Sequence, residues 1–302
     1  MREFELGSFL GCRLRGTTPA HRPGAHADGS RKAVLLGAPL DVTVSFRPGC
    51  RFGPERIRAV SRSLEEYSFV LQKGLEDVDF EDAGDIDIPL GNPARSVDQI
   101  ELACTEVFGR GDLLFLLGGE HLVTLGAVRA AKKFYPNLQV LQLDAHADLR
   151  DEYGEEKLSH ATVMRRVLEE IGPGRLHQVG IRSGVAEEVG VMRRYAAYYP
   201  GDFLEALGEA LKALEDKPVY LSIDIDVVDP AFAPGTGSPE PGGITSAELL
   251  EGLRLIGSKG INVIGMDVVE VSPPQDPSDV TSLLAARAVR DALIMFAGGA
   301  NE

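Results

Sequence analysis

From Ala33 onward, short apolar runs alternate with segments whose apolar residues recur every three to four positions. The runs are typical of buried strands, and the periodic segments of amphipathic helices. Strands that are apolar throughout and separated by helices indicate a parallel sheet covered on both faces. The pattern therefore predicts an α/β fold. The expected strands are Ala33–Ala38, Leu113–Leu117, Leu138–Leu143, Leu176–Ile181, Val219–Ile225 and Ile261–Val269.

Three of the intervening helices can be placed from local signals. Pro54 follows Gly53, and proline is common in the first turn of a helix. Apolar residues at helical spacing then predict helices over residues 54–64, 164–171 and 249–256. Thr245 and Glu248 have the spacing of a capping box before the last of these.

The chain is expected to form one domain behind a short arm. Its 302 residues permit one large domain or two small ones, but no linker-like change of composition and no internal repeat follows residue 32. We therefore divide it into an irregular N-terminal arm, residues 1–32, and a single domain, residues 33–302. His21 and His26 lie in the arm and are expected to face solvent.

The net charge of −15 argues against nucleic acid or an anionic membrane as a partner, and it is compatible with a cationic ligand. There is no transit peptide and no apolar run long enough to span a bilayer. The three cysteines, Cys12, Cys50 and Cys104, are widely spaced and form no disulfide framework or zinc pattern. We expect a cytoplasmic protein.

Three short motifs each follow an expected strand and carry side chains that bind metals. They are GGEH (Gly118–His121), DAHAD (Asp144–Asp148) and SIDIDVVDP (Ser222–Pro230). Because the carboxyl ends of parallel strands meet at one edge of a sheet, these side chains are expected to converge. In DAHAD the ligands alternate, which predicts that they point to one face of a strand. The six candidate ligands are His121, Asp144, His146, Asp148, Asp224 and Asp226.

The ligand types indicate two ions of an oxygen-preferring metal. Two imidazoles and four carboxylates without a thiolate suit manganese better than structural zinc. Six ligands are too many for one small ion and about right for two that share bridging carboxylates. A pair of divalent ions makes water nucleophilic near neutral pH, so the motifs predict a hydrolase. A lone DxD is more often a solvated turn, but three such motifs after three strands favour the metal site.

These motifs resemble those of the ureohydrolases, the family of arginases and agmatinases. The likeness spans residues 33–298 and also includes RPGCRFGP (Arg47–Pro54), Ser159-His160 and DVVE (Asp267–Glu270). It implies a three-layer α/β/α domain with an eight-stranded, mostly parallel sheet. It also implies two Mn²⁺ ions, with Asp144 and Asp224 bridging them. His121 and Asp148 would complete one ion's ligands, and His146 and Asp226 those of the other.

The resemblance further implies the catalytic roles. A hydroxide bridging the metals would attack a guanidinium carbon and release urea and an amine. Asp148 would hold the hydroxide, and Glu270 would orient the guanidinium group. His160 would pass a proton to the leaving amine, which suits an imidazole with a pKa near 6.5. The alternatives are a surface charge at a strand end for Glu270 and a helix-start residue for His160.

The loop Leu149–Leu158 bears on the substrate. Arg150 stands where the arginase pattern has an asparagine, which disfavours recognition of the arginine α-carboxylate. Asp151 and Glu152 are expected to suit a distal ammonium group and to bind substrate together with Glu270 and His160. The sequence is also similar to the agmatinase branch. It therefore predicts hydrolysis of agmatine to putrescine and urea, a step of polyamine biosynthesis.

Two alternatives stay open. Arg150 could bind a carboxylate, so the substrate could be 4-guanidinobutyrate, 3-guanidinopropionate or arginine. The chain could instead be a catalytically silent metal-binding homologue with a structural or regulatory role, although all six ligands, His160 and Glu270 are present. The resemblance also implies a homotrimer or homohexamer.

Overall fold

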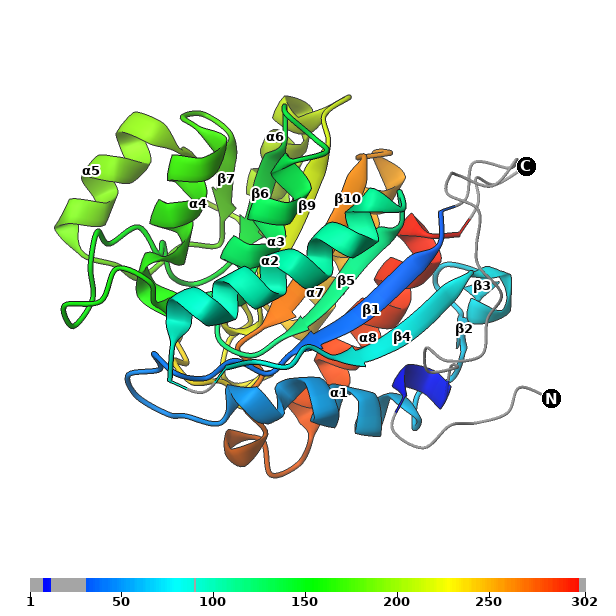
Figure 1. Ribbon diagram of the computed structural model, residues 1–302. Coiled ribbons are helices and arrows are strands. Elements are labelled where there is room, and N and C mark those ends of the chain that lie inside the picture. Colours follow the sequence, from blue (N-terminus) through cyan, green and yellow to red (C-terminus); the bar gives the residue numbers. More distant parts are fainter. Residues whose placement is uncertain (1–7, 12–30, 90, 299–302) are drawn as a thin grey trace.

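The computed structural model describes residues 8–11, 31–89 and 91–298 of the chain. Within these ranges, eight parallel strands form one sheet in the order β4-β1-β5-β10-β9-β6-β7-β8 (Figure 1). The predicted α/β/α class and sheet are therefore confirmed. The strands are β1 (Ala33–Ala38), β4 (Phe80–Asp85), β5 (Leu113–Gly118), β6 (Gln139–Leu143), β7 (Leu176–Val179), β8 (Ala197–Tyr199), β9 (Val219–Asp224) and β10 (Val263–Val269), beside a short antiparallel pair, β2 (Tyr67–Ser68) and β3 (Lys73–Gly74).

The six expected strands are the six inner strands of the sheet, and all six are buried at every residue. Such strands carry apolar side chains on both faces because helices cover both. The two strands at the sheet edges, β4 and β8, were not predicted. Strand β4 reads Phe80-Glu-Asp-Ala-Gly-Asp85, which lacks an apolar run, and β8 has only three residues.

Helices cover both faces of the sheet and complete the three layers (Figure 1). Helices α2 (Pro93–Gly109), α3 (Val123–Lys132) and α4 (Val163–Ile171) pack on one face. Helices α1 (Gly53–Ser61), α6 (Phe203–Leu214), α7 (Ser246–Ser258) and α8 (Val280–Phe296) pack on the other. The three expected helices are α1, α4 and α7, and α5 (Ala186–Tyr195) precedes β8. The predicted capping box is present, since Thr245 Oγ1 accepts the Glu248 N–H and the Glu248 carboxylate accepts the Thr245 N–H.

The order of the central strands creates a crevice at their carboxyl ends. Strands β6 and β9 are neighbours. The chain leaves β6 toward α4 on one face of the sheet and leaves β9 toward α7 on the other. Open α/β sheets bind ligands where adjacent strands diverge in this way. The metal-binding motifs therefore lie at the point in this fold that most favours a site.

Part of the N-terminal arm packs on the domain. Phe9–Gly11 form a single 3-10 turn, in which the Phe9 N–H donates to Asp82 and the Leu10 N–H to Ser61. Phe9 and Leu10 are buried in the core on the α1 face. His21 and His26 lie outside the described residues. Among the described helices, none combines the length with the apolar composition that crossing a bilayer requires.

Candidate metal centre

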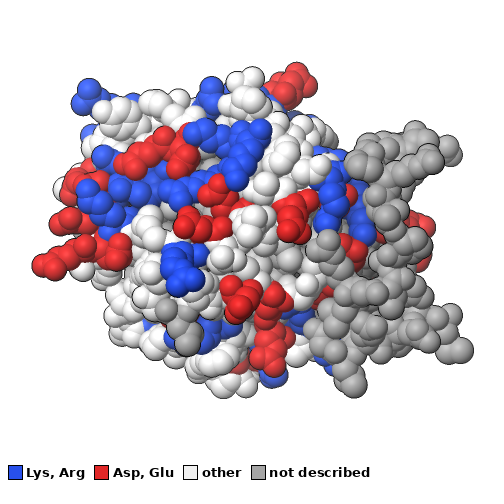
Figure 2. All heavy atoms as spheres, viewed as in Figure 1, with Lys and Arg blue, Asp and Glu red and all other residues white. Residues whose placement is uncertain are grey.

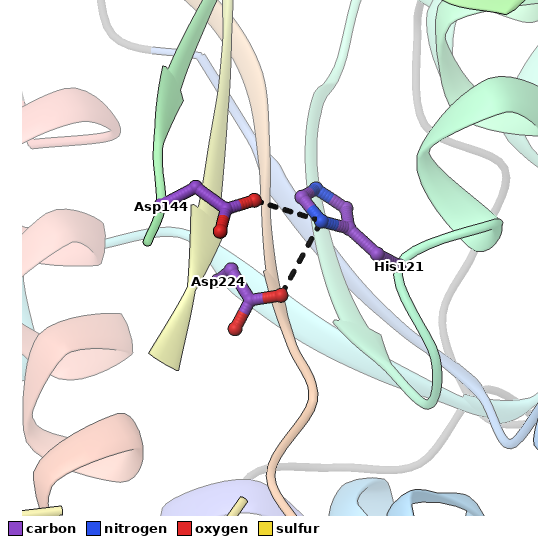
Figure 3. A group of neighbouring side chains, drawn as sticks. All are labelled: His121, Asp144 and Asp224. Atoms are coloured by element: carbon purple, nitrogen blue, oxygen red, sulfur yellow. Dashed lines mark ion pairs between the residues drawn. The ribbon is translucent and has the colours of Figure 1, made fainter. Parts of the chain in front are cut away.

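His121 lies at the centre of a first group of the predicted ligands. Its Nδ1 is 3.2 Å from Asp144 Oδ2, 3.1 Å from Asp148 Oδ2 and 3.3 Å from Asp224 Oδ2. Figure 3 shows His121, Asp144 and Asp224 pointing toward one another from three separate segments of the chain. His121 follows β5, while Asp144 follows β6 and Asp224 ends β9.

His146 and Asp226 form a second group with Asp144. His146 Nδ1 is 2.9 Å from Asp226 Oδ2 and 3.8 Å from Asp144 Oδ1. Among His121, Asp144 and Asp224, and likewise among Asp144, His146 and Asp226, one ligand atom per residue lies within 4.8 Å of the others. Because Asp144 belongs to both groups, two cations bound here would share a carboxylate.

The protonation of His121 shows that the first group fits a cation. Ser222 Oγ donates to Asp267 Oδ1 at 2.7 Å, so its lone pair accepts the Nε2–H of His121 at 2.9 Å. In the neutral imidazole, the hydrogen-bond network thus assigns the proton to Nε2 and a lone pair to Nδ1. This buried Nδ1 has no hydrogen-bond partner among the described residues. A lone pair that faces three carboxylate oxygens is repelled by them. Burial opposes protonation, but these aspartates raise the pKa of His121 well above its usual range, so Nδ1 holds a proton that a bound divalent ion would replace.

Two aspartates and one histidine of the site have pKa values far from their usual range. Burial, followed by the charges of Asp226 and Asp148, raises the pKa of Asp144 to about 7. Burial also raises the pKa of Asp224. Burial opposes protonation of His146, but its hydrogen bond with Asp226 raises the pKa of the imidazole to about 11. Carboxylates packed this closely hold protons unless a cation replaces them, so metal binding here releases protons.

The DAHAD ligands converge on the site, but not from one face of a strand as the sequence predicted. Strand β6 ends at Leu143, and Asp144–Asp148 form a loop, so the expected alternation along a strand is wrong. Asp144 Oδ1 accepts the N–H of His146 at 2.6 Å, which turns the chain directly after the strand. Asp148 then has a left-handed backbone, with φ of 53°.

The second acidic motif is folded by the same kind of contact. Asp224 Oδ1 accepts the N–H of Asp226 at 2.9 Å, and Ile225–Val227 form one 3-10 turn. Asp226 Oδ1 accepts the N–H of Ala145 at 3.2 Å, which ties this turn to the loop after β6. Short side chain–backbone contacts, rather than strand alternation, therefore bring the two loops together.

One cavity contains all the predicted ligands except the deeply buried Asp144, and it also contains the two other predicted catalytic residues. Glu270 is buried in its wall with a backbone φ of 63°, and its Oε1 accepts the His121 N–H at 2.8 Å. Burial raises the pKa of the Glu270 carboxyl well above its usual range. The cavity is lined by Ser45, His121, His146, Ala147, Asp148, Arg150, Tyr153, His160, Ala161, Ser183, Gly184, Glu188, Asp224, Asp226, Ser238 and Glu270.

His160 is held at the cavity wall by Thr43. The Thr43 hydroxyl donates to Glu120 Oε1 at 3.0 Å and accepts the His160 N–H, also at 3.0 Å. His160 Nδ1 lies 3.3 Å from the same hydroxyl oxygen, so it is the protonated nitrogen. The Nε2 atom, 3.5 Å from Ser45 Oγ, then carries the lone pair. Burial lowers the pKa of His160, which favours the neutral imidazole.

The two loop acids predicted to bind substrate lie elsewhere. Asp151 Oδ1 accepts a hydrogen bond from Arg166 Nη2 at 2.7 Å, and this contact lowers the pKa of the half-exposed carboxyl. Glu152 is exposed, and neither residue lines the cavity. The acid from outside the predicted set that does line it is Glu188, in the first turn of α5. Glu188 was missed because its role depends on burial in the cavity wall, and no sequence pattern shows that this acid is buried.

The chain is similar to proteins of known name. It matches the model of the arginase family over residues 31–295. An agmatinase from Bacillus anthracis is 49% identical over 264 residues, which cover 87% of this chain and 91% of the relative. A guanidinobutyrase from Pseudomonas aeruginosa is 37% identical over 278 residues, covering 88% and 86%. The crystal structure of the agmatine ureohydrolase of Thermoplasma volcanium aligns with a TM-score of 0.80 at 30% identity, covering 92% of this chain and 94% of that one.

Proposed function

Because this chain belongs to the arginase family and is a ureohydrolase, we propose that it hydrolyses agmatine to putrescine and urea with two Mn²⁺ ions. The observation that carries the proposal is the shared cavity. Two groups of metal ligands with Asp144 in common lie beside Glu270 and His160. The same space thus offers a place for cations, a carboxylate for a guanidinium group and a base.

The six ligands divide between the two ions. His121 and Asp148 would complete the ligands of one ion and His146 and Asp226 those of the other, and Asp144 and Asp224 would be shared by both. The position of His121 Nδ1 among the carboxylates and the raised pKa values of Asp144 and Asp224 support this division. The oxygen-rich donor set favours manganese over zinc. When bound, a pair of divalent ions lowers the pKa of water enough to supply a nucleophile near neutral pH.

Glu270 orients the substrate. One of its oxygens is fixed by the His121 N–H, so the carboxylate has one position in the cavity wall. Its remaining lone pairs can accept N–H groups from a planar guanidinium ion. This contact places the guanidinium carbon beside the metal ligands, where Asp148 can accept a hydrogen bond from the attacking water.

His160 moves the proton. Water adds its oxygen to the guanidinium carbon and gives up a proton, and the bond from that carbon to the alkyl-substituted nitrogen then breaks. The products are urea and an amine that needs the proton. His160 Nε2 is free to receive the proton and deliver it to the leaving nitrogen, because its Nδ1–H is held by Thr43.

A second candidate substrate class is a guanidino acid. Arg150 lines the cavity and could bind a carboxylate, and one relative is a guanidinobutyrase. The Arg150 side chain packs over Tyr153, however, and a carboxylate beside it would also lie near the carboxylate of Glu188. Its guanidinium carbon lies 5.1 Å from the centre of the Tyr153 ring, and its Nε is 3.9 Å from Glu188 Oε2. The higher identity with agmatinases also favours agmatine. The cytoplasmic location, the role in polyamine biosynthesis and the homotrimer or homohexamer stay predictions.

The test is the specificity constant for urea release from agmatine, arginine and 4-guanidinobutyrate on one manganese-loaded preparation. A carboxylate without a partner in this acidic cavity costs at least 1–3 kcal/mol, so agmatine should lead by about a hundredfold. If either carboxylate-bearing substrate equals agmatine, the assignment to agmatine is wrong. Urea release from that substrate would still leave the hydrolysis of guanidines intact.

A further inference from the structure

Glu188 is a buried acid in the catalytic cavity that the proposed mechanism does not use. Its side chain begins in the first turn of α5, lines the same cavity as Glu270 and is 3% exposed. A buried carboxylate normally has partners that explain its position. Its partners leave part of it open to the cavity.

Two backbone N–H groups hold the Glu188 carboxylate in one orientation. Oε1 accepts the N–H of Leu149 at 2.9 Å, and Oε2 accepts the N–H of Val185 at 2.8 Å. A carboxylate oxygen can accept two hydrogen bonds, so each oxygen keeps a second lone pair. The group is therefore fixed from behind and able to accept another donor.

Gly184 leaves Oε2 uncovered. A Cβ atom at this position would lie 3.0 Å from Glu188 Oε2, closer than ordinary van der Waals contact. Gly184 does not have the left-handed backbone that requires glycine. Glycine is therefore not needed here for the backbone conformation. Its missing side chain instead leaves open space beside Glu188 Oε2 in the cavity wall.

The nearest cation makes only a loose contact with Oε2. Arg150 Nε is 3.9 Å away, which is too long for a hydrogen bond. The guanidinium group packs over Tyr153 instead. A small cation that entered the cavity could approach Oε2 to hydrogen-bond distance and would be a better partner than Arg150.

We propose that Glu188 Oε2 binds the distal ammonium group of the substrate and thereby selects amines over acids at that end. The inference rests on the proposed function and names its specificity residue. Glu270 receives the guanidinium end, and Glu188 receives the other end of the same molecule. A substrate with a distal carboxylate would bring its negative charge against Glu188 and be rejected.

The experiment compares agmatine with n-pentylguanidine, in which a methyl group replaces the ammonium group. The variants are Glu188→Gln and Gly184→Ala, with Glu187→Gln as the matched control because Glu187 is exposed and does not line the cavity. The readout is kcat/KM for agmatine divided by kcat/KM for n-pentylguanidine. Metal content and thermal unfolding are checked in each variant. We expect the ratio to fall by about tenfold or more in both test variants and to stay within about twofold in the control.

The outcomes separate the inference from the function on which it rests. If wild-type protein releases urea from agmatine but the ratio is unchanged in folded Gly184→Ala and Glu188→Gln, Glu188 does not bind the ammonium group. If kcat/KM falls equally on both substrates, Glu188 only positions the loop that carries Asp148, and the inference is also overturned. No urea from agmatine with the manganese-loaded wild type would refute the proposed function itself.

Discussion

At the scale of single residues, Asp148 and Glu270 share a backbone conformation that few residues other than glycine adopt, with φ of 53° and 63°. Hydrogen bonds to residues far away in sequence stabilise this strained conformation. The Glu270 N–H donates to Gly119 O, and the N–H of Leu149, which follows Asp148, donates to Glu188 Oε1. The motifs identified both acids by residue type and order. Neither their conformation nor Glu188 could be predicted, because the fixing partners lie far away in sequence.

Loss of Asp224 should empty the site. Asp224→Ala removes a carboxylate 3.3 Å from His121 Nδ1 that also fixes the turn carrying Asp226. We expect elemental analysis to show less than one Mn²⁺ per chain and urea release to fall below detection. Asp98→Ala, on the exposed side of α2, is the control. Full metal occupancy with unchanged activity in Asp224→Ala would refute the ligand assignment.

Ser222 should control metal affinity without touching the metal. Ser222→Ala removes the acceptor for the His121 Nε2–H and a donor to Asp267, so the imidazole can turn or change tautomer. Such outer contacts typically contribute tenfold to a hundredfold in affinity, so Mn²⁺ binding by metal-depleted protein should weaken by about that factor. The exposed Ser258→Ala should leave it unchanged. Equal affinities in the two variants would show that Ser222 has no such role.

At the scale of elements, the strands that could be predicted are those buried on both faces. Such strands carry apolar side chains on both sides and are therefore visible in the sequence as continuous apolar runs. Edge strands such as β4 (Phe80–Asp85) carry polar side chains and depend on tertiary contacts. Asp82 in β4 binds Arg58 of α1 through two bonds of 2.7 and 2.9 Å, and both side chains are buried. This pair holds the edge strand to the helix, and no local pattern reveals it.

Arg58→Met should therefore destabilise the protein far more than a surface change. It leaves the buried Asp82 without its cation, which costs about 3–5 kcal/mol for a buried pair. The control is Arg56→Met, which breaks the exposed ion pair with Asp279. Urea-induced unfolding monitored by circular dichroism measures both. Similar losses in the two variants would show that the buried pair does not anchor β4.

At the scale of the whole molecule, the net negative charge does not exclude regions of the surface where basic and acidic side chains are mixed. On the face that carries α2 and α3, Figure 2 shows basic side chains gathered with acidic ones among them. There Arg129 and Lys132 pair with Glu170, and Lys133 pairs with Glu101. The net charge could not locate the acids that form the candidate metal centre. Those lie buried at the carboxyl ends of β6, β9 and β10.

Stability should fall in mild acid through His177, away from the metal ligands. Burial lowers the pKa of this imidazole to about 4, with Lys217 adding to the effect. Between pH 6.5 and 4 the unfolded chain binds a proton that the folded chain does not, so stability is lost as the pH falls through this window. The loss approaches about 3 kcal/mol at its lower end.

Unfolding by urea at several pH values, in wild type and His177→Gln, isolates this contribution from that of the aspartates. The variant lacks the titrating group and should lose less stability between pH 6.5 and 4 than the wild type. Its glutamine can still meet Tyr199 and Gln139, which contact His177 in the native protein. Identical slopes for the two proteins would remove His177 as the cause.

The most direct test of the central claim, a metal-dependent hydrolysis of agmatine at this cavity, is urea release by metal-depleted protein as Mn²⁺ is added back. We predict no urea without metal and a rise with added Mn²⁺ that saturates at two ions per chain, with putrescine formed in equal amount. Urea release that is independent of metal, or no urea at saturating Mn²⁺ and agmatine, would contradict the account.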